Sequence, residues 1–291
     1  MNAEHDRPSL LYHYTTASAM VSIIREGQLW ATDLRFLNDA RELELAKELL
    51  VEELQRLPLP DPGAYRPPDG NPLDDETAFR REVERMLLDG LDDFRCYVAC
   101  FCEDGDLLSQ WRGYASGEGV AIGFDVAALG ASIPIETDEQ VAHLEVDLRR
   151  VEYDEAVSRA LLAERAKQIN ERRPGHPFIA AWYEIWGLLL DLAATKHHAF
   201  REEREWRIIV PSTSADLTND RNRGKLKFRQ SPLGLVPYQC VTFDVRSIRE
   251  IRVGPGAHAA LRASALFDFL NSQLGNTQQV EIIPSEAPFR G

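Results

Sequence analysis

Residues 11–34 read LYHYTTASAMVSIIREGQLWATDL, and the part before the threonine pair has the alternation of a β-strand. If residues 10–15 are extended, Leu11, His13 and Thr15 lie on one face of the strand and the two tyrosines lie on the other. His13 is then either a structural histidine on a half-buried strand or a group that takes part in chemistry. The alternation alone leaves both interpretations open.

A short helix and a second strand follow directly. Thr16 or Ser18 can cap the helix, and Gly27 suits the left-handed conformation in which many helices end. Between these residues, Met20 and the isoleucine pair form an apolar stripe, and LWAT at residues 29–32 has the composition of a strand. The stretch therefore predicts a compact strand-helix-strand unit at the start of the fold.

The length and composition of the chain favour one domain. With 291 residues, 44% of them hydrophobic, the chain can bury one large core. We expect a single domain over residues 1–291, with the proline-rich segment 57–76 as a surface loop inserted in it. Predicted helices and strands follow one another without a regular βαβ rhythm, which favours the α+β class.

Period-2 and period-3.6 patterns place the remaining elements. Strands are predicted at 95–102, 119–125, 144–153, 225–229, 238–244, 248–253 and 279–283, and helices at 38–54, 76–93, 154–171, 178–199 and 257–274.

Charge and hydropathy limit the partners of the chain. A formal net charge of −14 argues against non-specific nucleic-acid binding, because it repels phosphate backbones. The chain has neither a signal-peptide pattern nor the roughly 20 uncharged apolar residues of a membrane span. We therefore expect no membrane contact and a cytoplasmic location.

Three of the four cysteines lie in RCYVACFC. Alternation places Cys96, Cys100 and Cys102 on one strand face with Val98. Because no histidine is nearby and the spacing is unusual for zinc, we interpret these residues as buried free thiols.

The stretch FREEREWRIIV is the most informative one for chemistry. If residues 203–209 are extended, Glu203, Glu205 and Arg207 project to one side. One interpretation is an edge strand with a solvated charged face. The other is a buried carboxylate pair, which needs a counter-charge such as Arg207 or a functional reason.

A second group of polar and aromatic residues lies in LSQWRGYASGEG, which has the composition of a turn. Ser109, Gln110, Trp111, Arg112 and Tyr114 offer a hydroxyl, an amide, two aromatic rings and a guanidinium. This set suits a ligand with a flat ring and a phosphate. The alternative is that Trp111 anchors the core and that Arg112 is its surface neighbour.

Two further clusters have simple structural explanations. Asp39 and Glu42 match a capping box at the start of a helix. Lys196, His197 and His198 suit the negative end of a helix dipole if a helix ends there.

Several motifs taken in order carry a family resemblance. The set LYHYTT, LND, LSQWRGYA, GEGVAIGF, KHHAF, EWRI and EIRVGPGA resembles DUF2971, a large bacterial family of unknown function. The resemblance spans nearly the whole chain except the proline-rich segment and residues 211–224. It implies no established activity.

The opening unit is also similar to that of NAD-dependent ADP-ribosyltransferases, particularly the toxin branch that modifies DNA. This resemblance implies a mixed or antiparallel split β-sheet flanked by helices, with NAD as substrate. It implies that His13 binds the ribose, with Thr15 beside it, and that Glu205 or Glu203 is the catalytic carboxylate. LSQW is a loose counterpart of the middle motif of that superfamily. The resulting candidate nucleotide-binding residues are His13, Tyr14, Thr15, Ser109, Trp111, Arg112, Tyr114 and Arg207.

Three functional hypotheses follow. The first is NAD-dependent ADP-ribosyl transfer or NAD hydrolysis, in stress or anti-phage defence, and it requires that His13, Glu205 and Trp111 converge on one cleft. The second is a non-catalytic module that binds a nucleotide-like small molecule. The third is a magnesium-dependent nuclease or phosphoesterase, which requires Asp39 and Glu42 close to the carboxylates of residues 203 and 205.

Overall fold

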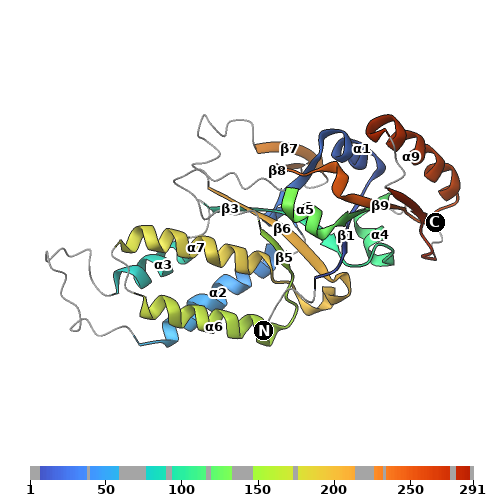
Figure 1. Cartoon of the computed structure of the whole chain (residues 1–291). Coiled ribbons are helices and arrows are strands. Elements are labelled where there is room, and N and C mark those ends of the chain that lie inside the picture. Colours follow the sequence, from blue (N-terminus) through green and yellow to red (C-terminus); the bar gives the residue numbers. More distant parts are fainter. Residues whose placement is uncertain are drawn as a thin grey trace.

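The computed structural model describes residues 7–37, 40–58, 77–89, 94–115, 119–132, 147–172, 176–213, 226–231, 234–275 and 280–288. In these residues one mixed, open β-sheet and the helices around it form a mixed α/β fold (Figure 1). Among them, no helix has the length and apolar character needed to cross a membrane.

The predicted opening unit is confirmed as β1 (Leu10–Thr15), α1 (Ala17–Glu26) and β2 (Gln28–Asp33). Local residues set its boundaries. The backbone N–H of Ala19 donates to Thr16 Oγ1 at 3.2 Å, so Thr16 caps the helix. Gly27 ends the helix with φ of 60°, a left-handed conformation that costs glycine little.

The sheet is built around β3 (Phe94–Cys102), in the order β10-β9-β4-β1-β3-β2-β8-β7. β6 (Glu205–Thr213) also pairs with β3, and β5 (Asp147–Arg150) pairs with β6. The described pairs are antiparallel except β9 with β10, which is parallel. The remaining strands are β4 (Val120–Asp125), β7 (Leu226–Ser231), β8 (Gly234–Thr242), β9 (Ile248–Val253) and β10 (Glu281–Pro284).

The sheet splits along one edge of β3. β6 pairs with the whole length of β3 on the opposite edge. On the split edge, β1 pairs with β3 only through Tyr12 and Cys102, and β2 pairs with it farther along, for example through Thr32 and Val98. Residues 99–101 of β3 therefore have no strand partner on this edge within the described residues. β1 and β2 diverge there, which leaves room for side chains between them.

Four helices form a layer beside the start of β3 (Figure 1). They are α2 (Ala40–Arg56), α3 (Ala78–Leu88), α6 (Glu155–Glu171) and α7 (Pro177–Ala193), and their buried apolar faces share one core. The ring of Phe94 in β3 contacts this layer, with centroid distances of 4.5 Å to Trp182 and 5.3 Å to Trp186. The helical layer is thus anchored to the sheet at the first residue of β3.

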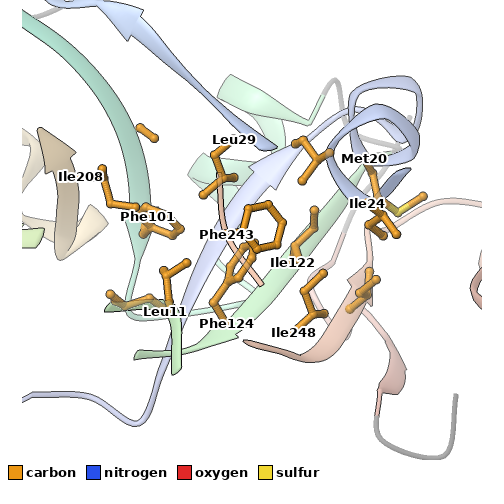
Figure 2. Packing of buried hydrophobic residues seen from close by; sticks show 14 of the residues in the cluster. Leu11, Met20, Ile24, Leu29, Phe101, Ile122, Phe124, Ile208, Phe243 and Ile248 are labelled. Carbon is orange, nitrogen blue, oxygen red and sulfur yellow. The ribbon is translucent and has the colours of Figure 1, made fainter. Parts of the chain in front are cut away.

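A second core lies between the sheet and the helices α1, α5 (Val126–Ser132) and α9 (Ala259–Leu274). Figure 2 shows Phe124 and Phe243 among aliphatic side chains from several strands, with Met20 and Ile24 of α1 nearby. Phe124 packs edge to face against Phe101 at 5.8 Å and against Phe243 at 5.2 Å. This core fixes β1 and β3 beside each other where the sheet splits.

Two predicted elements are wrong in type or extent. LSQWRGY was predicted as a turn but forms the helix α4 (Leu108–Tyr114). The helix predicted at 178–199 ends at Ala193, because the chain then pairs with the segment after β5. Thr195 bridges Glu152, and the backbone N–H of Lys196 donates to Glu152 O at 3.0 Å.

The solvated-edge interpretation of FREEREWRIIV is also wrong. β6 is an inner strand that pairs with both β3 and β5, and Glu205 and Arg207 are buried. Most of the proline-rich segment, residues 59–76, lies outside the described residues, as does Asp39 of the predicted capping box.

Candidate functional site

A pocket lies where β1 separates from β3. Its cavity has a volume of about 50 Å³, and the empty space including the open mouth is about 350 Å³. Its walls come from β1, β3, α4 and the start of β6. The lining residues are Tyr12, His13, Tyr14, Cys100, Phe101, Gln110, Tyr114, Glu203 and Glu205.

His13 fills part of the gap left by the split. Its Nδ1 lies 2.9 Å from the backbone oxygen of Cys100. Cys100 is one of the residues of β3 without a strand partner on the split edge. A carbonyl oxygen only accepts, so Nδ1 carries the proton and donates. Burial lowers the pKa of His13, although the hydrogen bond to Cys100 opposes this effect. The imidazole is therefore neutral at neutral pH, and its Nε2 is a hydrogen-bond acceptor on the pocket wall.

Tyr14 connects the pocket to the loop before α4. Its hydroxyl donates to Asp104 O and accepts from the backbone N–H of Leu107, both at 2.8 Å. The Tyr14 ring packs edge-on against Trp111 at 4.7 Å, and Trp111 Nε1 donates to Asp106 Oδ1 at 2.8 Å. Because these contacts join β1, the loop and α4, they fix the position of α4 at the pocket.

Two acidic and two basic side chains form a buried group beside the pocket, which we call the sheet cluster: Lys196, Glu203, Glu205 and Arg207. Lys196 Nζ donates to Glu203 Oε2 at 2.7 Å and to Glu205 Oε2 at 2.9 Å. Arg207 donates to Glu205 through Nε at 2.8 Å and through Nη2 at 3.1 Å, and its Nη1 donates to Ala193 O at 2.8 Å. The charges of the four groups balance.

The pKa of Glu205 follows from these contacts. Burial by itself would raise it, but the charge and hydrogen bonds of Arg207, together with the charge of Lys196, lower it from 4.5 to about 2. Glu205 is thus a carboxylate at any physiological pH. It can stabilise positive charge, whereas its low basicity makes it a poor proton acceptor.

A backbone turn brings the two glutamates together. Glu203 ends the 3₁₀ segment His198–Glu203, and Arg204 has φ of 40°, an uncommon left-handed conformation for a residue other than glycine. Glu205 then starts β6, with its backbone N–H donating to Tyr153 Oη at 2.9 Å. The prediction that Glu203 is part of the strand is therefore wrong, but both carboxylates still reach Lys196 and the pocket.

The pocket brings together five of the predicted site residues: His13, Tyr14, Tyr114, Glu203 and Glu205. Trp111 does not line it, because it is fully buried and packs against Tyr14, as the core-anchor alternative stated. Of the three residues predicted to converge on one cleft, only His13 and Glu205 therefore do so. Arg112 is exposed on α4 and does not line the pocket either. Thr15 and Ser109 are likewise absent from the lining.

Arg207 does not fit the predicted role of a phosphate ligand. Its side chain is 1% exposed and is engaged with Glu205 and Ala193 O. Sequence reasoning missed Lys196 as a partner of the glutamates, because the helix was extended through it. It named Gln110 in a group of residues suited to a ligand but did not include it among the nucleotide-binding residues, and it gave Cys100 no role at the pocket.

The metal hypothesis gains no support from the described residues, which contain no group of three or more potential metal ligands. Lys196 Nζ occupies the position between Glu203 and Glu205 in which a cation would bind them both. Asp39 and the side chain of Glu42 lie outside the described residues.

The predicted buried free thiols are confirmed for Cys96 and Cys102, and Cys100 is free but only partly buried.

Comparison with known families gives one match. Residues 110–208 match a family described as "Protein of unknown function (DUF2971)". The matched residues run from α4 to β6, so they include Gln110, Tyr114 and the whole sheet cluster, but not β1 with His13. No curated protein and no solved structure matches the chain significantly.

Proposed function

We propose that this chain cleaves NAD at the bond between nicotinamide and ribose, and transfers ADP-ribose to a macromolecule or to water. One observation carries the proposal: His13 from β1 and Glu205 from β6 line the same pocket, together with several aromatic residues. The split of the sheet supports an ADP-ribosyltransferase-like fold, because the pocket lies at the point where β1 and β3 diverge.

The proposed step is a substitution at the ribose C1′ atom. The bond from C1′ to the ring nitrogen breaks, and nicotinamide leaves with the bonding electron pair as a neutral molecule. An oxygen or nitrogen of the acceptor supplies the new electron pair to C1′ and loses its proton. Positive charge develops on the ribose before the new bond forms, so a nearby carboxylate lowers the barrier.

The residues of the pocket suit this step. Glu205 is ionised, and it accepts three hydrogen bonds from Lys196 and Arg207. A carboxylate offers about four acceptor positions, so a ribose hydroxyl can bind by replacing the weak thiol donor of Cys100. His13 Nε2 can accept from another ribose hydroxyl. Glu203, whose side chain is 12% exposed, takes the proton of the acceptor in this proposal.

The direct test is nicotinamide release from NAD by the purified full-length chain, with water or cell extract as the source of acceptor. We expect release by the wild type, a loss of about 10²–10³-fold in Glu205→Gln because the charge next to the ribose is removed, and a clear loss in His13→Ala. Circular dichroism of each variant checks that the fold is kept. Wild-type release that is unchanged in Glu205→Gln contradicts the proposed site.

A second candidate function is a module that binds a nucleotide-like ligand without reaction. It is favoured by the charge balance of the sheet cluster, in which each glutamate already has a basic partner. This candidate predicts saturable binding of NAD, measured by calorimetry, with no nicotinamide release under any acceptor condition. The two functions therefore differ in one measured product.

A further inference from the structure

Gln110 is an unexplained polar side chain on the pocket wall. It belongs to α4, is 7% exposed and lines the pocket. No hydrogen bond joins its side-chain amide to another of the described residues. Its amide atoms are not among the fully buried, unpartnered side-chain atoms of the described residues, so they reach the open space of the pocket, where water or a ligand can complete their hydrogen bonds.

The position of Gln110 is fixed by its neighbours. Trp111, next in the chain, is fully buried and is held by Asp106 and by the ring of Tyr14. The backbone N–H of Trp111 also donates to Leu107 O at 3.1 Å, in the first turn of α4. Because the helix cannot turn without breaking these contacts, the Gln110 amide remains at the pocket.

The other pocket groups define which ligand chemistry can satisfy this amide. Lys196 and Arg207 balance the charges of Glu203 and Glu205, so the sheet cluster favours an uncharged ligand group. The imidazole of His13 is neutral and presents an acceptor. An amide side chain has one acceptor oxygen and two N–H donors, which match a ligand group that both donates and accepts. A primary carboxamide on a flat ring has this property, and aromatic residues line the same pocket.

We propose that Gln110 recognises the carboxamide of the nicotinamide ring and thereby selects it over the corresponding carboxylate. This inference rests on the proposed function, since it assigns a substrate group to the same pocket. A carboxylate lacks the N–H donors of the carboxamide and adds a negative charge beside Glu203 and Glu205. The carboxamide exchanges a donor and an acceptor with Gln110 and leaves the charge balance unchanged.

The test measures binding of free nicotinamide, nicotinate and benzamide to the full-length chain by calorimetry, and needs no turnover. Wild type is compared with Gln110→Met, which keeps the length of the side chain but removes both hydrogen-bonding functions. Gly113→Ala is the control on the same helix, because an added Cβ at Gly113 meets nothing within 4 Å.

We expect wild type and Gly113→Ala to bind nicotinamide and benzamide about tenfold or more tightly than nicotinate, as the loss of one or two hydrogen bonds implies. In Gln110→Met, affinity for both carboxamides falls by about tenfold and the preference over nicotinate disappears. Equal preference in Gln110→Met and wild type overturns the inference, as does the absence of carboxamide binding to the wild type.

The outcomes separate this inference from the proposed function. Nicotinamide release from NAD by both wild type and Gln110→Met, with unchanged preference for the carboxamide, leaves the function standing and overturns the role of Gln110. Selective carboxamide binding that depends on Gln110, without any release from NAD, supports the role of Gln110 and contradicts catalysis.

Discussion

Two groups of ion-paired side chains contain buried carboxylates, and they differ in how far their basic members are exposed to water. In the sheet cluster, Lys196 and Arg207 are 2% and 1% exposed, so both signs of charge are removed from solvent. A second group, the helix cluster, joins α6 to α7: Arg165, Arg172, Glu184 and Asp191. Its arginines are 28% and 50% exposed, while Glu184 is 7% exposed.

Ion pairs of similar geometry differ in the free energy that the protein loses when one partner is removed. Arg172 Nη1 lies 2.9 Å from Glu184 Oε2, and Arg165 Nη2 lies 2.9 Å from Asp191 Oδ2, which are distances like those in the sheet cluster. The helix-cluster arginines stay hydrated when a partner is lost, so that loss costs little. In the sheet cluster the remaining charge is left buried beside a pocket, where it costs more and where it can act on a ligand.

The largest expected effect is that of Arg207→Met. This substitution leaves Glu205 with Lys196 as its basic partner and removes the hydrogen bond to Ala193 O. We expect a loss of about 3–5 kcal/mol in the free energy of unfolding, measured by urea denaturation. Arg165→Met in the helix cluster is the matched control, with an expected loss of about 1 kcal/mol or less, because Glu184 keeps Arg172 and Asp191 keeps Arg149. Equal losses in the two variants contradict the comparison.

Acid titration should give the next largest effect. The folded state lowers the pKa of Glu205 from 4.5 to about 2, so the unfolded state binds more protons between these values. Stability from Glu205 is then fully present above about pH 5 and is lost as the pH falls toward 2, by about 3 kcal/mol in total. The measurement is the difference in unfolding free energy between wild type and Glu205→Gln over this range. A difference that does not change with pH contradicts the lowered pKa.

A smaller effect is expected for Tyr14→Phe, which tests how α4 is fixed at the pocket. Removing the hydroxyl leaves Asp104 O and the N–H of Leu107 without this partner. We expect a loss of about 1–3 kcal/mol in unfolding free energy, together with weaker ligand binding at the pocket. The comparison variant is Tyr114→Phe, whose residue is 43% exposed, with an expected change within about 0.5 kcal/mol. Equal losses would show that the Tyr14 hydroxyl does not fix the loop.

The smallest effect on the free energy of unfolding is expected for Arg172, the most exposed member of the helix cluster. Arg172→Gln should lower the unfolding free energy by at most about 1 kcal/mol, because Arg172 is half exposed. Screening should shrink this difference further when salt is raised to about 1 M. Thermal unfolding at two salt concentrations measures it, and a large effect that salt does not change would place Arg172 in the same class as Arg207.

Local signals in the sequence were sufficient for the opening unit and for most strands. Thr16 and Gly27 act within a few residues of themselves, so the start and end of α1 could be predicted. The end of α7 could not, because it depends on pairing between Thr195 and the distant Glu152. The inner position of β6 could not be predicted either, because the alternation of residues in a strand does not show which strands lie beside it.

The candidate site was predictable in part. The repulsion between Glu203 and Glu205 signalled a counter-charge, and Arg207 was named, but Lys196 was assigned to a helix end. The register between β1 and β3 decides that His13 lies near Glu205, and register is a property of tertiary structure. Gln110 was named in a group of residues suited to a ligand but was not selected for the site, because an amide in a short polar stretch is common on protein surfaces.

The measurement that tests the central claim most directly is the rate of nicotinamide release from NAD by Glu205→Gln and by Glu184→Gln, at a temperature where both variants are folded. Both substitutions neutralise a buried, ion-paired glutamate. Of the two glutamates, Glu205 lines the pocket and Glu184 does not. We expect Glu184→Gln to retain the wild-type rate within about twofold, and Glu205→Gln to lose about 10²–10³-fold. Equal rates in the two variants would contradict a catalytic carboxylate in the split of the sheet.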